Sequence, residues 1–307
     1  MKLINQSFEI LEQKDFTITG IKKFIERCGR VCYKSEDRIT DDSYEKFVNM
    51  LESRGHDRPL EFGTVHLKMI LPDFEGFIHS LLTVGMLNNI WIKHAYKGDV
   101  IYITTNYRYY LDIIKYFPNV RKYLTEEDNE YYPKRYAVHF ITSRGIMDEF
   151  RTHVGLSHLA ESTRYCNYSK DKFNNELTFI RPCWLNIPTG QHVYWNGDWC
   201  DINKMKIQLP EGEHEDIDAF LWALSNAEMQ YTLLINNRWT PQQARDVLPL
   251  AIKSELISCG FEDAWENFMR RRSPKYGDPG AHPMAAEIAD KLCEEFLKRG
   301  FIDEKKI

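Results

Sequence analysis

The sequence lacks a long apolar stretch and any pattern typical of a secretory leader. Charged residues interrupt the opening "MKLINQSFEILEQKD". A transmembrane helix needs about 20 apolar residues, and a signal peptide needs an apolar core of its own. Neither a membrane span nor export is therefore predicted.

Closely paired cysteines are also lacking. The seven cysteines are scattered, odd in number and include no CxxC pair. Disulfide frameworks use an even number of cysteines, and structural zinc sites use closely spaced ligands, so we expect neither. The pattern is typical of free thiols in a reducing compartment. We therefore expect a cytoplasmic protein that binds no metal.

A strong net charge is absent as well. The formal net charge is -5 and the isoelectric point is near 6.1. Such a surface does not attract polyanions in general, so nucleic acid and anionic membranes are not expected partners, whereas a small anion held by a few arginines is. There is no internal repeat, low-complexity segment or composition break, which predicts one domain over residues 1–307.

The apolar residues that are present recur with the periods of both helices and strands. We expect helices over 17–30, 41–53 and 145–160, strands over 62–71, 135–143 and 176–184, and a strand that turns helical within 99–117. A Trp-rich insertion near 184–215 is interpreted as a surface loop, and the chain from Asp216 onward as helical. This mixture indicates an α+β fold.

The stretch "TPQQARDVLPL" has the features of a helix start. Thr240 suits the N-cap, Pro241 the first helical position, and Gln243 completes a capping box. Arg245 would lie one turn into this helix, and Pro249 must kink or interrupt it.

A later apolar stripe ends in an arginine. Phe261, Trp265, Phe268 and Met269 share one helical face. Arg272 follows eleven residues after the first of them, which places it about 20° from the same face at about 100° per residue. We therefore expect the Arg272 side chain to face inward.

An inward guanidinium needs a partner, because an unpaired buried charge costs several kcal/mol. One hypothesis is a salt bridge from Arg272 to Glu255 or Asp263. The alternative is a ligand that offers a carbonyl, an imide or a phosphate.

A polar run follows the helix expected over 145–160. Glu149, His153 and Ser157 are spaced four apart and would share one face of that helix, and Gly155 suggests a close packing contact there. His153 alone is compatible with a hydrogen-bonded core residue. The hydroxyls, backbone amides and arginine of residues 162–164 suit a phosphate, or form a solvated loop.

These segments resemble the flavin-dependent thymidylate synthase family. "ESTRYCNYSKDKF" is similar to the segment that follows the family's signature helix. The other similar blocks, in the family's order, are "CGRVCYKSE", "RGHDRPLEFGTV", "ITSRGIMDEFRTH", "ARDVLPLAIKSE" and "WENFMRRRSPKYGDPGAHPMAAEIA", the last with an extra "KYGDPG". The resemblance covers nearly the whole chain.

The resemblance implies a homotetramer of α+β chains with active sites at subunit interfaces. It implies methylation of dUMP to dTMP, with 5,10-methylenetetrahydrofolate as carbon donor, NADPH as reductant and FAD as hydride carrier. This class uses no cysteine nucleophile, so the uracil ring must be polarised, and a nearby arginine can stabilise the developing negative charge.

On the nucleotide side the family's positions are retained. The resemblance places Arg272 against the uracil and gives a catalytic role to Arg272 and to Ser162, the latter without a covalent adduct. The residues implied to bind dUMP are Glu149, Ser162, Thr163, Arg164, Arg245 and Arg272.

On the flavin side the match is poor. His56, His153 and Asn267 are retained, and Arg58, Arg144 or Arg151 could substitute for missing arginines. The positions that depart from the family are Thr152, Val154, Phe62 and Phe261. Two alternatives stay open: hydroxymethylation of dUMP or dCMP with little need of flavin, and a non-catalytic dUMP-binding tetramer.

Overall fold

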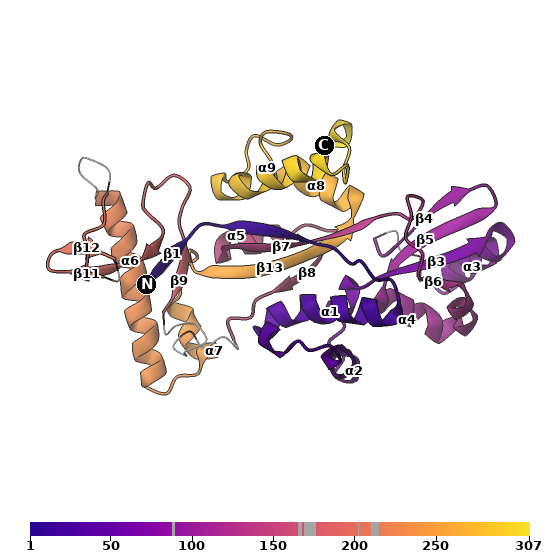
Figure 1. The fold of residues 1–307 in the computed structure, drawn as a ribbon, viewed down its shortest axis with the longest axis horizontal. Helices are drawn as coiled ribbons and strands as arrows, with labels where there is room; N and C mark the ends of the chain where they lie inside the picture. Colours follow the sequence, from indigo (N-terminus) through magenta and orange to yellow (C-terminus); the bar gives the residue numbers. More distant parts are fainter. Residues whose placement is uncertain (88–89, 165–167, 169–175, 202, 210–214) are drawn as a thin grey trace.

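The computed structural model describes residues 1–87, 90–164, 168, 176–201, 203–209 and 215–307. At its centre is a four-stranded antiparallel sheet in the order β2-β7-β13-β8 (Figure 1). The strands are β2 (Ser7–Leu11), β7 (Arg135–Ser143), β13 (Lys253–Phe261) and β8 (Ser157–Ala160).

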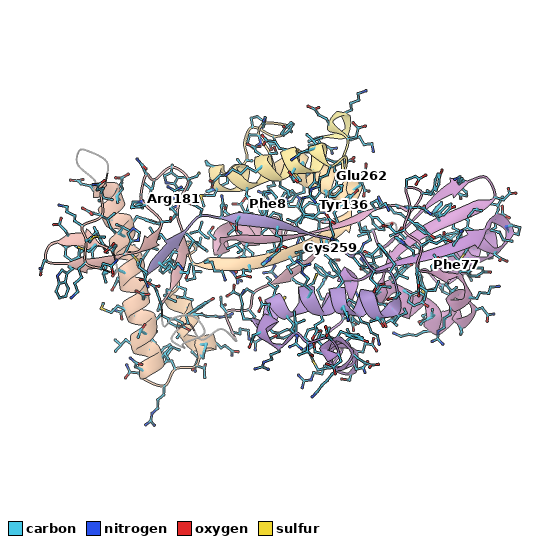
Figure 2. All side chains as sticks on the ribbon, viewed as in Figure 1. Phe8, Phe77, Tyr136, Arg181, Cys259 and Glu262 are labelled. Atoms are coloured by element: carbon cyan, nitrogen blue, oxygen red, sulfur yellow. The ribbon has the colours of Figure 1, made fainter. Side chains whose placement is uncertain are left out.

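Helices cover both faces of the central sheet (Figure 1). One face packs against α1 (Ile18–Tyr33), and the other packs against α5 (Arg144–Phe150), α8 (Glu262–Arg272) and α9 (Pro283–Lys298). Because successive strand residues point to opposite faces, Cys259 belongs to the α1 side, whereas Phe8 and Tyr136 belong to the α9 side (Figure 2).

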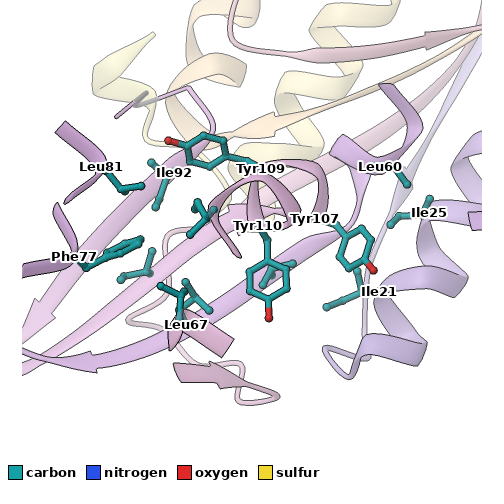
Figure 3. Close-up of a cluster of buried hydrophobic side chains, with 14 of the residues drawn as sticks. Ile21, Ile25, Leu60, Leu67, Phe77, Leu81, Ile92, Tyr107, Tyr109 and Tyr110 are labelled. Carbon is teal, nitrogen blue, oxygen red and sulfur yellow. The ribbon is translucent and has the colours of Figure 1, made fainter. Parts of the chain in front are cut away.

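A second antiparallel sheet follows α1 and α2 (Ser43–Ser53) and has the order β4-β5-β3-β6. Its elements are β3 (Thr64–Ile70), α3 (Leu71–Thr83), β4 (Ile92–Lys97), β5 (Val100–Asn106), α4 (Tyr107–Tyr116) and β6 (Leu124–Thr125). Figure 3 shows Ile21 of α1 near Tyr107 of α4, and Ile21 and Ile25 belong to the same buried cluster as Val65 and Leu67 of β3, so α1 also contributes to the core of this second sheet.

A third group of elements lies beyond the other end of the central sheet (Figure 1). It consists of β1 (Lys2–Ile4), β9 (Thr178–Ile180), β10 (Gly190–Gln191), β11 (Val193–Trp195), β12 (Asp198–Cys200), α6 (Glu215–Asn236) and α7 (Pro241–Ala244). Part of the Trp-rich segment expected to be a loop is thus a hairpin. Trp199 of this hairpin is buried, with its ring edge-on to Trp222 of α6 at 5.2 Å.

Short 3-10 helices complete the described elements: Glu36–Arg38, Arg58–Phe62, Pro118–Tyr123, Arg245–Val247 and Glu304–Lys306. Within the described part of the chain, no helix combines the length and apolar character needed to cross a bilayer.

Much of the predicted secondary structure is confirmed. The α+β class, the helices near 17–30 and 41–53, the strand at 135–143 and the strand-to-helix change within 99–117 are all present. The capping box of Thr240 and Gln243 is formed, and the chain leaves the helical conformation before Pro249, as expected.

Two predicted helical stretches are wrong. The helix expected over 145–160 ends at Phe150, and Gly155 adopts a left-handed φ of 96° in the turn that leads to strand β8. The chain after Asp216 is not wholly helical, because 253–261 forms the central strand β13. That strand is buried on both faces, so it lacks the alternating pattern by which a strand is predicted.

Candidate active site

Arg272, the last residue of α8, makes three hydrogen bonds to residues of the α5 region. Its Nε donates to His153 Nε2 at 2.9 Å, its Nη1 to Glu149 Oε2 at 2.5 Å and its Nη2 to the Glu149 carbonyl at 3.1 Å. The Arg272 side chain is only 18% exposed and that of Glu149 is 37% exposed. The predicted inward orientation of Arg272 is therefore confirmed.

The predicted protein partners of Arg272 were wrong. Glu255 pairs instead with Lys34 and Lys253, and Asp263 pairs with Lys93. Asp263 lies at the first turn of α8, at the opposite end of the helix from Arg272. Glu255 points to the α1 side of the sheet, the face opposite to α8.

His153 is a neutral hydrogen-bond acceptor in this group. Its Nε2 accepts the Nε–H of Arg272, so this nitrogen carries no proton. Burial, reinforced by the positive charge of Arg272, lowers the pKa of His153 to about 4. The imidazole ring lies 4.8 Å from the ring of Phe268, which fixes its orientation.

Glu149 and His153 were predicted to share one helical face, but they do not. Helix α5 ends between them, and the turn after Phe150 brings His153 back toward α8. Ser157 lies apart from the group, because its hydroxyl donates to Glu61 Oε2 at 2.6 Å. The predicted three-residue alignment was therefore wrong, although two of its members share Arg272.

A second group forms where residues 162–164 meet the segment after α6. Thr163 is buried and its Oγ1 accepts a hydrogen bond from Arg245 Nη1 at 3.3 Å. Arg164 Nε donates to Gln242 Oε1 at 2.8 Å, and the backbone N–H of Ser162 donates to the Cys32 carbonyl at 3.3 Å. The two sequence motifs expected to bind the nucleotide thus lie side by side.

The capping box of α7 orients this second group. It starts the short helix that holds Gln242 and is followed directly by Arg245. Arg245 therefore lies just after α7 and not one turn inside it, which corrects the prediction. Tyr165 and Cys166, which continue the "STRYC" motif, lie outside the described residues.

Charged residues behind the second group were missed by the sequence analysis. Glu161 is fully buried, and its Oε2 lies 2.9 Å from Lys253 Nζ. Lys34 and Lys253 both pair with Glu255 Oε1, and His139 Nε2 lies 2.9 Å from Glu255 Oε2. The sequence did contain a signal for this cluster. In "KSE", Lys253 and Glu255 are two residues apart, the spacing of residues on one face of a strand, and apolar residues flank them.

The residues implied to contact flavin are dispersed. His56 Nδ1 lies 3.2 Å from the Tyr33 hydroxyl, and Arg58, 61% exposed, pairs with Glu61. Asn267 accepts a hydrogen bond from Arg271 at 3.4 Å. The proposed substitutes Arg144 and Arg151 both pair with Asp148.

Three of the flavin positions do meet around one cavity of about 270 Å³. Val154, Phe261 and Asn267 line it, together with Lys93 and Asp263. Val154 is 78% exposed and offers no polar group, and the charge of Lys93 is matched by Asp263 at 2.5 Å. Among the described residues of this lining, no charge is uncompensated.

The two other positions that depart from the family, Phe62 and Thr152, offer no replacement for its charged flavin contacts. Phe62 is fully buried against α1, and the Thr152 hydroxyl donates to the Glu149 carbonyl at 2.7 Å. A pyrophosphate is held by guanidinium groups or by free backbone N–H groups. The residues at the family's flavin positions in this chain therefore do not fit FAD in the family's usual manner.

The comparison with protein-family models agrees with the motif analysis over residues 135–299. The model of the family "Thymidylate synthase complementing protein" (Thy1) matches residues 135–299. Among solved structures, the UMP/dUMP methylase PolB from Streptomyces cacaoi bound with 5-Br UMP is 12% identical, with a TM-score of 0.45 over 100% of this chain and 94% of that chain. The same enzyme bound with 5-Br dUMP is 13% identical, with a TM-score of 0.43 over 100% and 95%.

No curated protein sequence matches the chain. The family match spans more than half of it and includes both groups of contacts, from Glu149 and His153 through Ser162–Arg164 and Arg245 to Arg272. The chain belongs to the thymidylate synthase complementing protein family, the flavin-dependent thymidylate synthases.

Proposed function

We propose that this protein adds a one-carbon unit to C5 of dUMP. In its full form, the proposal takes the carbon from 5,10-methylenetetrahydrofolate and the electrons from NADPH, uses FAD as the intermediate carrier, and gives dTMP. Family membership supports this assignment. The structural observation on which it rests is the Arg272 guanidinium held between Glu149 and a neutral His153.

Arg272 is well suited to polarise a uracil ring. A guanidinium has five N–H donors, and the described contacts of Arg272 use three of them. The other two can donate to a carbonyl oxygen of the base. Negative charge that develops on the ring in the transition state is then stabilised by a cation that is already oriented.

The second group suits the nucleotide phosphate. The Arg245 guanidinium donates to the Thr163 hydroxyl, and the Arg164 guanidinium donates to Gln242 of the adjoining short helix. Charge-assisted hydrogen bonds from arginine to phosphate are about twice as strong as neutral ones. Ser162 is proposed to bind and orient the nucleotide through its hydroxyl, without forming a covalent bond.

The flavin step involves the positions at which this chain departs from its family. FAD supplies a hydride when it is bound, but Thr152, Val154, Phe62 and Phe261 provide none of the charged contacts described for the family. We therefore assign no step of the reaction to contacts between these residues and flavin.

The test is a binding and product experiment on the purified protein. Calorimetry should detect binding of dUMP and much weaker binding of deoxyuridine, which lacks the phosphate. Incubation with dUMP, 5,10-methylenetetrahydrofolate and NADPH should give dTMP by mass spectrometry when FAD is present, and none when FAD is absent. A protein without measurable affinity for dUMP would overturn the proposal.

The lining of the 270 Å³ cavity favours one alternative. With Val154 and Phe261 in place of polar residues, hydroxymethylation of dUMP or dCMP with little need of flavin is the second candidate. The same incubation distinguishes it, because the product would be the 5-hydroxymethyl nucleotide formed without FAD. Binding of dUMP without any product would favour a non-catalytic nucleotide-binding protein.

The proposal includes assembly as a homotetramer with shared active sites. The second group and the Arg272 group come from different elements of the chain. In the proposed tetramer, the second group of one chain meets the Arg272 group of a neighbouring chain. Light scattering coupled to size-exclusion chromatography gives the assembly state directly.

A further inference from the structure

A cluster of buried charges lies directly behind Ser162 and has no part in the proposed chemistry. Glu161 is 0% exposed, Glu255 9%, Lys34 13% and Lys253 15%. The two lysines balance these two buried carboxylates, Lys34 also lies 3.5 Å from the exposed Glu36, and His139 joins the cluster through Glu255. Because the charges compensate each other, the cluster is not built to attract an ion of either sign.

Glu161 uses both carboxylate oxygens and its backbone in this cluster. Oε2 accepts from Lys253 Nζ at 2.9 Å, and Oε1 accepts from the Tyr168 hydroxyl at 3.2 Å. The Glu161 backbone N–H donates to the Glu255 carbonyl at 2.7 Å. One side chain therefore joins residue 161 to residue 168, on either side of Ser162, Thr163 and Arg164.

Stability alone does not account for such a cluster. Buried ion pairs are often no more stabilising than apolar residues of the same volume, because desolvation offsets their attraction. Burial opposes the charged form of Lys253, but Glu161 and Glu255 outweigh it and raise the pKa of Lys253 well above its usual range. The lysine is therefore charged at neutral pH, and its position is fixed by the two carboxylates.

We propose that Glu161, Tyr168 and Lys253 form a clasp that sets the position of Ser162, Thr163 and Arg164 for the nucleotide phosphate. The inference rests on the proposed function of that segment. The clasp residues are positioning residues, because they act through the segment that they close. Lys253 anchors the clasp to the central strand β13, and the backbone contact with Glu255 keeps Glu161 in register with that strand.

The sharpest test is Tyr168→Phe, which removes one hydroxyl and keeps the ring. One hydrogen bond to a charged group contributes about 1.5 kcal/mol or more, so we expect dUMP affinity to fall about tenfold. The melting temperature and the kcat at saturating dUMP should change little. Tyr107→Phe, at a buried tyrosine of the core in Figure 3, is the matched control and should leave dUMP affinity unchanged.

Lys253 gives an independent arm. Lys253→Met should raise the KM for dUMP more than it lowers kcat, and Lys253→Arg should restore most of the loss because it retains the charge opposite Glu161. If Lys253→Met fails to fold, the Tyr168→Phe comparison still decides.

Hydrogen–deuterium exchange without ligand separates the clasp from the proposed function. Peptides covering residues 161–168 should exchange faster in Tyr168→Phe than in the wild type, whether or not the protein binds dUMP. Unchanged exchange in Tyr168→Phe would overturn the clasp. If the wild type binds dUMP, faster exchange in Tyr168→Phe with unaltered dUMP affinity would also overturn it. A wild type that binds no dUMP overturns the proposed function and, with it, the role given to the clasp.

Discussion

Replacing Arg272 with alanine should abolish turnover while the protein still folds. The change removes a guanidinium that donates to His153 and Glu149. The carboxylate of Glu149 is 37% exposed and can be hydrated, so its loss of a partner costs little. The buried acceptor of His153 is left unsatisfied, at about 1–3 kcal/mol. This cost is smaller than the free energy of unfolding of a typical folded protein, which is ~5–15 kcal/mol.

The expected loss in ligand binding is larger. If the two remaining N–H groups of Arg272 donate to the uracil, their removal costs about 1.5–3 kcal/mol each, a factor of at least about 100 in the dUMP dissociation constant. Arg271→Ala is the control, because Arg271 is exposed and its hydrogen bond to Asn267 is long at 3.4 Å. It should change the free energy of unfolding by less than about 0.5 kcal/mol.

Calorimetric dUMP titration, urea unfolding and an assay for tritium release from C5-labelled dUMP would together check this prediction. An Arg272→Ala protein that binds dUMP as tightly as the wild type would refute the contact with the base. A variant that unfolds, together with a wild type that has no affinity for dUMP, would show that Arg272 is purely structural.

Two further predictions concern the same two groups, one concerns flavin, and one concerns the charges of Glu255 and Lys253. Ser162→Ala should raise the dUMP dissociation constant about fivefold through one lost hydrogen bond, and a covalent nucleotide adduct on Ser162, seen by mass spectrometry, would contradict its non-covalent role. Glu149→Gln replaces an acceptor beside Arg272 with an amide that also donates, so the affinity for dCMP relative to dUMP should increase in competition titrations; an unchanged ratio would exclude contact with the base edge. FAD should be absent from the purified protein and bind only when added, more tightly with dUMP present, in a fluorescence titration; protein that purifies saturated with flavin would contradict this. Burial opposes ionisation of Glu255, but the hydrogen bond from His139 and the charge of Lys253 outweigh it and lower its pKa. Glu255 therefore adds stability above its unfolded pKa of about 4.3, and this stability is lost as the pH falls. The raised pKa of Lys253 adds stability below about pH 10.4, and this stability is lost as the pH rises. In urea unfolding from pH 3 to 11, the free energy of unfolding of the wild type should be nearly constant around neutral pH and fall at low pH. This fall should be smaller in Lys253→Met.

The inward orientation of Arg272 was predictable because it depends on one helix alone. Trp265, Phe268 and Met269 fix which face of α8 is buried, and the arginine follows by spacing. Its partners were not predictable from that helix, because they depend on where α5 ends.

The strand β13 was missed for a different reason. Its residues from Leu256 to Phe261 are buried on both sides, one side against α1 and the other against α8 and α9. A strand covered twice has no polar face, so its apolar run is not distinguishable from a buried helix by periodicity. The resemblance to a family located the motifs on either side of it but not the strand itself.

The connection between β13 and α8 limits which length changes the protein can accept during evolution. Lys253, the first residue of β13, belongs to the charge cluster, and α8 begins immediately after Phe261 and ends at Arg272. A deletion or insertion of one residue within the strand would turn every following side chain to the other face of the sheet. A change within the helix would rotate Arg272 by about 100°. Homologues should therefore keep residues 253–272 at constant length and vary at the loop that follows.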